Sequence, residues 1–170
     1  DNEIVFNPYA GGFGSNVNLE DRTLRRGVSL NSRWRLDRHL TLVLNGTLQR
    51  AEFDEGEWEG NDVPLVSRQL FYAQANWQAL SWLELSLAHR YVGKRRFDND
   101  QPNDFQQIDS YRMTDLEDTA RYQNAYLRIG AYNLEDELAA DYGVKATNNL
   151  SYNAYPLPER HYRVSLGMEF

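Results

Sequence analysis

The chain ends on ten residues that alternate between polar and apolar side chains without a break, His161-Tyr162-Arg163-Val164-Ser165-Leu166-Gly167-Met168-Glu169-Phe170. Successive side chains in a β-strand point to opposite faces, so this stretch predicts a strand with one apolar face and one polar face. A strand of a soluble β-sandwich can show the same pattern. The fold class therefore depends on how often the pattern recurs and on how the repeats are connected. The apolar face would carry Tyr162, Val164, Leu166, Met168 and Phe170.

The alternation recurs along the chain. A period of two residues predicts strands and is incompatible with helices. Clear strands are expected at 28–36, 40–49, 71–78, 83–91 and 126–131. With the terminal strand 161–170 and the weaker segments 4–6 and 111–122, the total is about eight strands, as in a small membrane barrel. In the segment 111–122, Asp118 would share the apolar face, so we expect a bulge, a loop end or a register change there.

The connections between these strands alternate strictly between short and long. Short turns are expected at 37–38, 80–81 and 123–124, and long polar links at 7–21, 54–64, 97–107 and 135–158. An up-and-down transmembrane β-barrel sorts its connections in this way, with short periplasmic turns on one rim and long external loops on the other. Both chain ends would then lie on the short-turn rim. We therefore favour an all-β, antiparallel outer-membrane barrel over a soluble sandwich.

Composition agrees with this reading. The 170 residues suggest one domain, and the mean hydropathy is -0.71. No apolar run reaches the roughly 18 residues of a membrane-spanning helix, but a barrel strand needs only about 9–11 residues, half of them apolar. Aromatic residues make up 13% of the chain, which suits strands and interfacial belts. The net charge of -7 argues against a nucleic-acid partner, and the absence of cysteine excludes disulfides and cysteine-bound metals.

In the barrel reading, the polar face of each strand lines the lumen and the apolar face contacts lipid. Lipid and lipopolysaccharide are then the surrounding partners. Trp34, Trp77, Tyr122 and Phe170 would belong to the lipid-facing aromatic belts. The predicted lumen-facing residues are Arg33, Arg35, Gln74, Asn76, Glu84, Arg90, Arg128, Arg163 and Glu169.

Candidate ligand contacts lie in the long links. Lys94, Arg95 and Arg96 stand where a strand meets a loop and could contact an anionic siderophore or lipopolysaccharide, although a solvated rim is the favoured explanation. Tyr152 and Tyr155 in the last link could stack on a ligand or pack against the loop itself.

We expect neither a metal site nor a cofactor nor catalysis. The aspartates of segment 98–104 lack the glycine and glutamate spacing of a calcium loop. His39, His89 and His161 have no metal-like spacing. Ser86 and His89 fall on opposite strand faces and cannot form a nucleophile–base pair simply.

Five stretches resemble the carboxyl-terminal barrel of the TonB-dependent outer-membrane receptors. The family patterns are "N-L-D-R-T-x-R-R-G-V-E-L", "W-x-L-T-D-R-L-S-L", "G-N-R-I-P-L-V-P-R", "E-N-L-F-D" and "P-G-R-T-Y-R-V-G-L-x-Y-x-F". The similar stretches here are, in the same order, 18–30, 34–42, 60–68, 132–136 and 158–170. The departures are Ser67 for proline, Glu135 for phenylalanine and Glu159 for glycine.

The resemblance implies uptake of ferric siderophores or other scarce nutrients, and a terminal Phe170 that the barrel-assembly machinery reads together with the apolar residues before it. The resemblance covers only the final part of such a barrel. We therefore treat 1–170 as one barrel region with no plug domain and no TonB-contact segment. TonB would act only through a plug that is not part of these residues. The alternative is a stand-alone eight-stranded barrel with a structural or adhesive role. Because an open strand edge is costly in lipid, the strands must either close on themselves or pair with further strands of a larger barrel, and for the isolated chain we slightly favour self-closure. The sequence does not identify the ligand.

Overall fold

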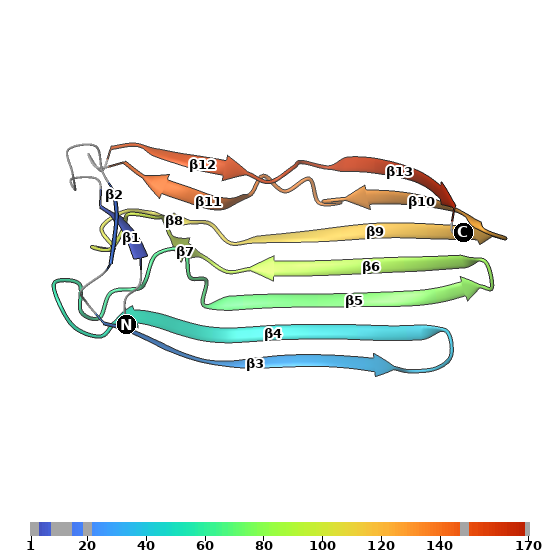
Figure 1. Cartoon of the computed structure of the whole chain (residues 1–170), viewed down its shortest axis with the longest axis horizontal. Coiled ribbons are helices and arrows are strands. Elements are labelled where there is room, and N and C mark those ends of the chain that lie inside the picture. The colour runs from blue at the N-terminus through green and yellow to red at the C-terminus, as the bar shows by residue number, and fades with distance from the viewer. Residues whose placement is uncertain (1–3, 8–14, 19–21, 147–149, 169–170) are drawn as a thin grey trace.

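A computed structural model of the chain describes residues 4–7, 15–18, 22–146 and 150–168, with only the backbone of 4–7 and 15–18. The described residues contain no helix that could cross a membrane. Their main feature is a seven-stranded antiparallel sheet, in the order β13-β10-β9-β6-β5-β4-β3 (Figure 1). Its strands are β3 (Thr23–Arg35), β4 (Leu40–Phe53), β5 (Gln69–Leu80), β6 (Leu83–Val92), β9 (Tyr111–Tyr122), β10 (Ala125–Tyr132) and β13 (His161–Met168).

Short turns close one end of the sheet, as predicted. In the turn between β3 and β4, the backbone N–H groups of His39 and Leu40 donate to Asp37 Oδ1 at 2.6 and 2.9 Å. These hydrogen bonds favour the carboxylate and hold the pKa of Asp37 below its ordinary value. The aspartate thus acts as a side-chain cap that fixes the reversal of the chain.

Long connections lie at the opposite end, which confirms the predicted sorting (Figure 1). They span residues 54–68, 93–110 and 133–160. Two of them contain small antiparallel ladders of their own, β7 (Arg95–Arg96) with β8 (Gln107–Ile108) and β11 (Ala140–Lys145) with β12 (Tyr152–Pro156). We call the sheet's two ends the turn end and the loop end.

The first predicted strand does not join the main sheet. Among the described residues, β1 (Ile4–Asn7) pairs with β2 (Ser15–Asn18) and with no strand of the main sheet, and this separate pair lies at the loop end (Figure 1). The prediction of an eighth barrel strand beginning at the turn end is therefore wrong. A four-residue strand is too short to cross a bilayer, because a spanning strand needs about 9–11 residues.

The predicted irregularity at Asp118 is also wrong. β9 pairs without a register shift on both sides, and Asp118 lies opposite Leu85 on β6 and Ile129 on β10. The carboxylate is therefore part of the apolar face.

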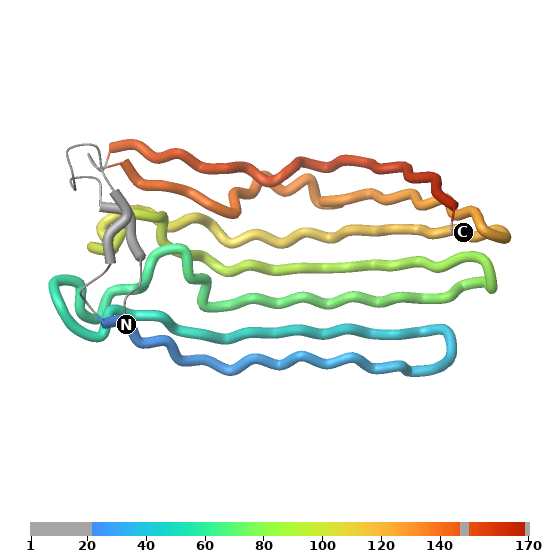
Figure 2. The backbone as a smooth tube through the Cα atoms, in the orientation of Figure 1, coloured from blue at the N-terminus to red at the C-terminus, as the bar shows by residue number. Residues whose placement is uncertain are grey.

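The sheet is open, which contradicts the expected self-closure. In the described residues β3 and β13 each have one neighbour in the sheet and lie at its opposite margins (Figure 2). Each margin presents a row of backbone N–H and C=O groups without a strand partner. Such an edge in lipid costs several kcal/mol for each unsatisfied group, so these margins need further strands.

The apolar face of the sheet has no layer over it formed by the residues that the structure describes. The register confirms the predicted alternation, and large apolar side chains remain solvent-accessible along the strands. Val28 is 75% exposed and Leu166 is 79% exposed. An uncovered apolar face of this extent marks a surface that contacts another apolar phase. Further exposed members are Leu30, Trp34, Leu48, Phe71, Trp77, Leu87, Tyr122, Ile129, Tyr162, Val164 and Met168.

Candidate functional site

The polar face of the sheet carries eight of the nine residues predicted to face the lumen. Cross-strand partners point to the same face, and the registers connect these positions from β3 through to β13. The ninth, Glu169, and the terminal Phe170 lie outside the described residues. The residues that share the polar face are Arg33, Arg35, Gln74, Asn76, Glu84, Arg90, Arg128 and Arg163.

Hydrogen bonds join part of this face on β5 and β6. The Tyr72 hydroxyl donates to Gln74 Oε1 at 2.8 Å, and Gln74 Nε2 donates to Asn76 Oδ1 and Ser86 Oγ, both at 2.9 Å. Because Ser86 belongs to this network while His89 lies on the opposite face, the structure keeps the two apart. The serine is therefore a structural hydrogen-bond partner.

An ionic and aromatic group continues the polar face across β9, β10 and β13. Arg128 Nε lies 3.2 Å from Glu117 Oε1, and the Tyr132 hydroxyl donates to Glu117 Oε2 at 2.8 Å. The Arg163 guanidinium lies 5.5 Å from the centre of the Tyr132 ring. The His161 ring stacks on the same tyrosine, with the two ring centres 5.0 Å apart. Glu117 thus balances the charge of Arg128 within this group, and Arg163 lies against an aromatic ring.

The three long connections form one layer at the loop end, which we call the loop layer (residues 54–68, 93–110 and 133–160). Asn103 links the first two loops, because its Oδ1 accepts from the Asp62 N–H at 2.9 Å and its Nδ2 donates to the Asp62 carbonyl at 3.0 Å. Asn61 Nδ2 donates to the Gln101 carbonyl at 2.9 Å. These contacts join a side chain of one loop to the backbone of the other, 41 or 40 positions away, so loop 54–68 and loop 93–110 hold each other in place.

A buried lysine joins the second and third loops. Lys145 Nζ lies 3.3 Å from Asp100 Oδ1 and 2.8 Å from Asp104 Oδ1, and the Asp100 side chain is fully buried. Burial raises the pKa of Asp100 above its ordinary value, and the Lys145 ammonium opposes that rise. Asp100 and Asp104, two of the aspartates of segment 98–104, therefore bind a cation supplied by the chain itself. Among the residues described, no group of three or more His, Asp and Glu is placed to hold a metal ion.

Aromatic contacts reinforce the same junction. Tyr152 packs against Phe97 and Phe105 with ring centres at 5.0 and 5.9 Å, and Tyr155 lies 5.4 Å from Tyr142. Both predicted ligand tyrosines thus pack within the loop layer, yet about half of each side chain stays exposed, 48% for Tyr152 and 57% for Tyr155. They can therefore stabilise the loop and still present a ring face outward.

Tyr142 has a carboxylate partner in the neighbouring loop. Its hydroxyl donates to Asp98 Oδ2 at 2.6 Å. This hydrogen bond, helped by partial burial and by the negative charge of Asp98, raises the pKa of Tyr142 to about 12. The bond is a second clamp between the loops.

The three consecutive cations have separate surroundings. Lys94 is 58% exposed and pairs with Asp109 at 3.0 Å. Arg95 is only 3% exposed, and its Nη2 donates to the carbonyls of Ala140 and Asp141 on β11. Arg96 donates to the Phe105 carbonyl at 2.8 Å and pairs with Asp100. The structure therefore brings Arg95 and Arg96 into the loop layer and leaves Lys94 facing solvent.

Two departures from the family patterns have local roles. Ser67 is buried, and its hydroxyl lies within hydrogen-bonding distance of the carbonyls of Gln69 and Gly93 at 2.9 and 3.0 Å. Glu135 accepts hydrogen bonds from the backbone N–H and the hydroxyl of Thr114. Burial opposes ionisation of Glu135, but these bonds outweigh it and lower the pKa of Glu135. Both side chains tie a loop to the strand beside it.

The histidines are likewise distributed among local contacts. His39 Nε2 accepts from Arg38 Nε in the turn, His89 Nδ1 lies 2.8 Å from Thr114 Oγ1, and His161 stacks on Tyr132.

Residues that the sequence reading missed are mainly partners in the loop layer. Each of these residues contacts a partner at least 41 positions away in the sequence: Lys145, Tyr142 and Asn103. Asn103 also makes hydrogen bonds to nearer residues. No short motif signals such pairings. The acidic segment 98–104 was the available signal, because buried carboxylates need a cation nearby.

Known proteins resemble this chain in sequence family and in fold. Residues 1–134 match a family model described as TonB dependent receptor-like, beta-barrel. A search of curated proteins gives no match. Among solved structures, the ferric-catecholate import receptor Fiu of E. coli K12 is similar with a TM-score of 0.76 at 18% identity, over 100% of this chain and 24% of that one. The ferric yersiniabactin uptake receptor FyuA of Yersinia pestis has a TM-score of 0.72 at 25% identity, over 85% and 23%.

The ferric preacinetobactin receptor BauA of Acinetobacter baumannii is also similar, with a TM-score of 0.66 at 15% identity, over 98% of this chain and 25% of that one. The chain thus spans about a quarter of the length of each of these receptors. The family is one of bacterial outer-membrane receptors and transporters, and its barrels place long loops outside and short turns in the periplasm. The family match over most of the chain, together with the fold, shows that this chain belongs to the TonB-dependent receptor β-barrel family of the bacterial outer membrane.

Proposed function

We propose that the chain is a sector of the barrel of a receptor that takes up ferric siderophores or a similar scarce nutrient. The observation that carries the proposal is the match of the whole described sheet and loop layer to ferric-siderophore receptors, with the full chain aligned to Fiu. Transport belongs to the complete receptor, in which a plug would engage TonB. A catalytic role has no support in the described side-chain arrangement.

The polar face of the sheet lines the lumen in this proposal. Its mixed charges, such as the pair of Arg128 with Glu117, suit a hydrated interior. The apolar face contacts outer-membrane lipid. The exposed apolar residues of β13, together with the terminal Phe170, form the signal that the barrel-assembly machinery reads.

The loop layer captures the ligand from outside. Lys94, Tyr152 and Tyr155 are its accessible candidates, because each keeps about half of its side chain exposed. Arg95 and Arg96 position the loops around them. A ferric siderophore offers both aromatic or planar chelating groups and negative charge, which match tyrosine rings and an ammonium group.

The test uses the complete receptor in its native bacterium. Deletion of its gene should abolish uptake of at least one ferric siderophore from a panel of catecholate, phenolate and hydroxamate chelates. The triple variant Lys94→Ala, Tyr152→Ala, Tyr155→Ala should weaken binding of that chelate by about tenfold or more at unchanged receptor abundance. Uptake of every chelate at wild-type rate after deletion would contradict the proposal.

The stand-alone structural barrel is the weaker candidate. It requires β3 and β13 to pair with each other, whereas in the described residues they are opposite margins of an open sheet.

A further inference from the structure

Three aromatic rings meet where loop 93–110 contacts the hairpin of β11 and β12. The Phe97 and Phe105 ring centres lie 5.5 Å apart, and the Tyr152 ring centre lies 5.0 Å from the first and 5.9 Å from the second. Phe97 is only 3% exposed, whereas Tyr152 is 48% exposed. The cluster therefore has a buried side and an open side, and the open side is Tyr152, one of the accessible ligand candidates.

Both phenylalanine rings meet the tyrosine ring at a steep angle. The planes of Phe97 and Tyr152 are inclined by 58°, and those of Phe105 and Tyr152 by 62°. Inclined contacts of this kind are directional, because the positive edge of one ring meets the negative face of another. Two such contacts from different positions restrict the Tyr152 side chain to one orientation, although about half of it is accessible to solvent.

The Phe97 ring occupies a space that a glycine leaves open. Gly143 lies two residues before Lys145, the cross-strand partner of Tyr152, so these three positions share one face of the hairpin. A Cβ atom at position 143 would lie 2.4 Å from Phe97 Cε1, far inside a normal contact distance. Because Gly143 has no side chain, the Phe97 ring can reach the β11 backbone beside Tyr152.

Backbone hydrogen bonds hold the phenylalanine against this glycine. The Asp98 N–H donates to the Gly143 carbonyl at 2.8 Å, and the Lys145 N–H donates to the Asp98 carbonyl at 2.9 Å. Asp98 directly follows Phe97 in the chain, so these bonds fix the point from which the ring enters the hairpin. A displacement of Phe97 would therefore strain two hydrogen bonds between the loops.

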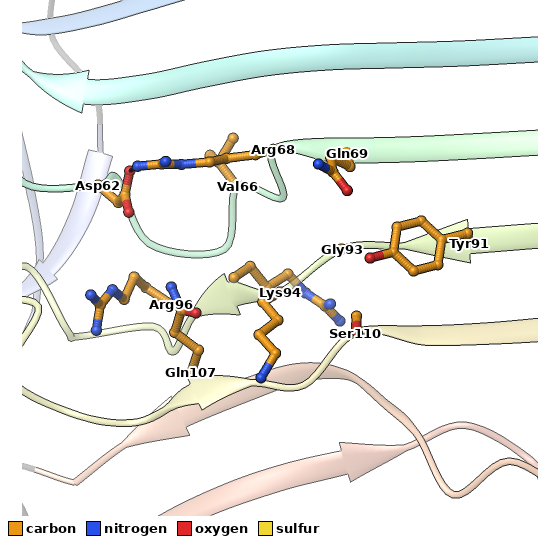
Figure 3. Close-up of a pocket in the computed structure, with 11 residues that line it drawn as sticks. Asp62, Val66, Arg68, Gln69, Tyr91, Gly93, Lys94, Arg96, Gln107 and Ser110 are labelled. Atoms are coloured by element: carbon orange, nitrogen blue, oxygen red, sulfur yellow. Dashed lines mark hydrogen bonds and ion pairs between the residues drawn. The ribbon is translucent and has the colours of Figure 1, made fainter.

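Loop 93–110 is also fixed against loop 54–68 (Figure 3). A cavity of about 400 Å³ lies between these loops, and its lining includes Arg68 and Arg96. Arg68 pairs with Asp62 at 2.6 Å within loop 54–68. The Leu65 N–H donates to the carbonyl of Arg96, the residue directly before Phe97, at 3.0 Å. The backbone that carries Phe97 is thus held by both neighbouring loops.

We propose that Phe97, seated against Gly143, is a positioning residue that holds the Tyr152 ring in the orientation in which it stacks on an aromatic or planar group of a ferric chelate. The inference rests on the proposed function, in which Tyr152 contacts the ligand. A ring that is already ordered loses little side-chain freedom when the chelate binds, which lowers the entropic cost of binding. Phe97 itself is too deeply buried to touch the chelate.

The first test is a double-mutant cycle in the complete receptor, purified in detergent. Ferric catecholate, phenolate and hydroxamate chelates are titrated by calorimetry, and the cycle is measured with each chelate that the wild type binds. The variants are Phe97→Leu, Tyr152→Ala and the two together. Phe53→Leu is the matched control, because Phe53 is another buried ring at the loop end, 2% exposed, and packs on Trp58.

We expect Phe97→Leu to weaken chelate binding by about three- to tenfold when Tyr152 is present. The same change should cost less than about twofold in the Tyr152→Ala background. Phe53→Leu should leave the affinity unchanged. Equal losses in the two backgrounds would overturn the proposal, because Phe97 would then act on the loop layer as a whole, and so would the absence of any loss. If Phe97→Leu does not fold, Phe105→Leu decides by the same criterion.

A second measurement needs no chelate. Tyr152 of the complete receptor is labelled as fluorotyrosine and observed by fluorine NMR. Phe97→Leu and Gly143→Ala should each move its signal towards that of an unfolded chain, whereas labelled Tyr155, which packs on Tyr142, should keep its signal in Phe97→Leu. An unchanged Tyr152 signal would overturn the proposal. If no chelate binds the wild type, the proposed function fails, and this signal still decides whether Phe97 orders the ring.

Discussion

Lys145 provides the positive charge on which the loop layer depends. Its side chain is 5% exposed and contacts Asp100, which is fully buried, and Asp104. Removing one partner of a buried ionic group leaves the other charge without compensation, which is far more costly than losing an exposed pair. The cluster also joins loop 93–110 to loop 133–160, so its loss should separate the two loops.

Substitution of Lys145 by Met should destabilise the loop layer by up to about 3–5 kcal/mol, because the fully buried Asp100 would lose its ammonium partner and keep only the pair with Arg96 at 3.6 Å. Hydrogen exchange of loops 93–110 and 133–160 in the complete receptor measures the effect. Lys94→Met is the matched control: its exposed pair with Asp109 predicts a loss of only about 0–1 kcal/mol. Equal protection in the two variants would refute a structural role for Lys145.

Tyr142 should ionise at a pH about two units above an ordinary tyrosine, because its pKa is raised from 10.0 to about 12 by the hydrogen bond to Asp98. A raised pKa means that the folded state favours the protonated phenol. The contribution to stability is therefore fully present below pH 10.0 and is lost as the pH rises towards 12. Ultraviolet difference titration of the wild type against Tyr142→Phe isolates this tyrosinate. Asp98→Asn should bring its pKa back towards 10.0, and an unchanged pKa in that variant would show that the bond is not the cause.

At the scale of elements, β9 shows how pairing dominates over side-chain preference. Its neighbours β6 and β10 both impose a regular register, so Asp118 is placed on the apolar face between Leu85 and Ile129. A bulge would remove this carboxylate from the lipid, but it would also disrupt ladders on two sides. Glu117, one residue earlier, points to the polar face and pairs with Arg128 at 3.2 Å. The two adjacent acids therefore test the assignment of faces.

Asp118→Leu should stabilise the complete receptor in lipid vesicles by about 1–2 kcal/mol, because it removes an acid from the lipid-facing side. Glu117→Leu should instead destabilise it, since Arg128 and the Tyr132 hydroxyl lose their acceptor. Guanidinium unfolding of both variants measures the difference. The reverse order of stability would mean that the assignment of faces is wrong and that Glu117, rather than Asp118, lies on the lipid-facing side.

At the scale of the molecule, alternation of side chains predicted much of the fold. The alternating pattern predicts from the sequence alone that residues such as Val28 and Leu166 lie on the apolar face. The length of each connection predicts at which end of the sheet it lies. Contacts across long sequence separations could not be predicted: Lys145 meets Asp100 at a separation of 45 residues, and Arg95 is buried by β11 at a similar separation. The place of Ile4–Asn7 outside the sheet depends on its pairing with Ser15–Asn18, which a short apolar run does not specify. Of the candidate site, the exposed positions Lys94, Tyr152 and Tyr155 were predicted from the sequence, and their binding of a ligand stays a prediction; the cavity between loops 54–68 and 93–110 was not predicted.

The margins of the sheet decide whether these 170 residues can stand alone. β3 and β13 pair on one side only in the part of the chain that the structure describes, and their free edges would face lipid in an isolated chain. The matched receptors are about four times as long, which leaves room for the strands that would cover both margins.

Heat-modifiable gel mobility of the isolated 170-residue chain, refolded in detergent, tests the claim that the sheet is an open sector of a larger barrel. The complete receptor, treated in the same way, is the positive control. We predict that the isolated chain gives no compact, fast-migrating band that shifts on boiling, because β3 and β13 lack partners. A compact band that does shift would contradict the account, since the seven strands would then close on themselves without the rest of a receptor.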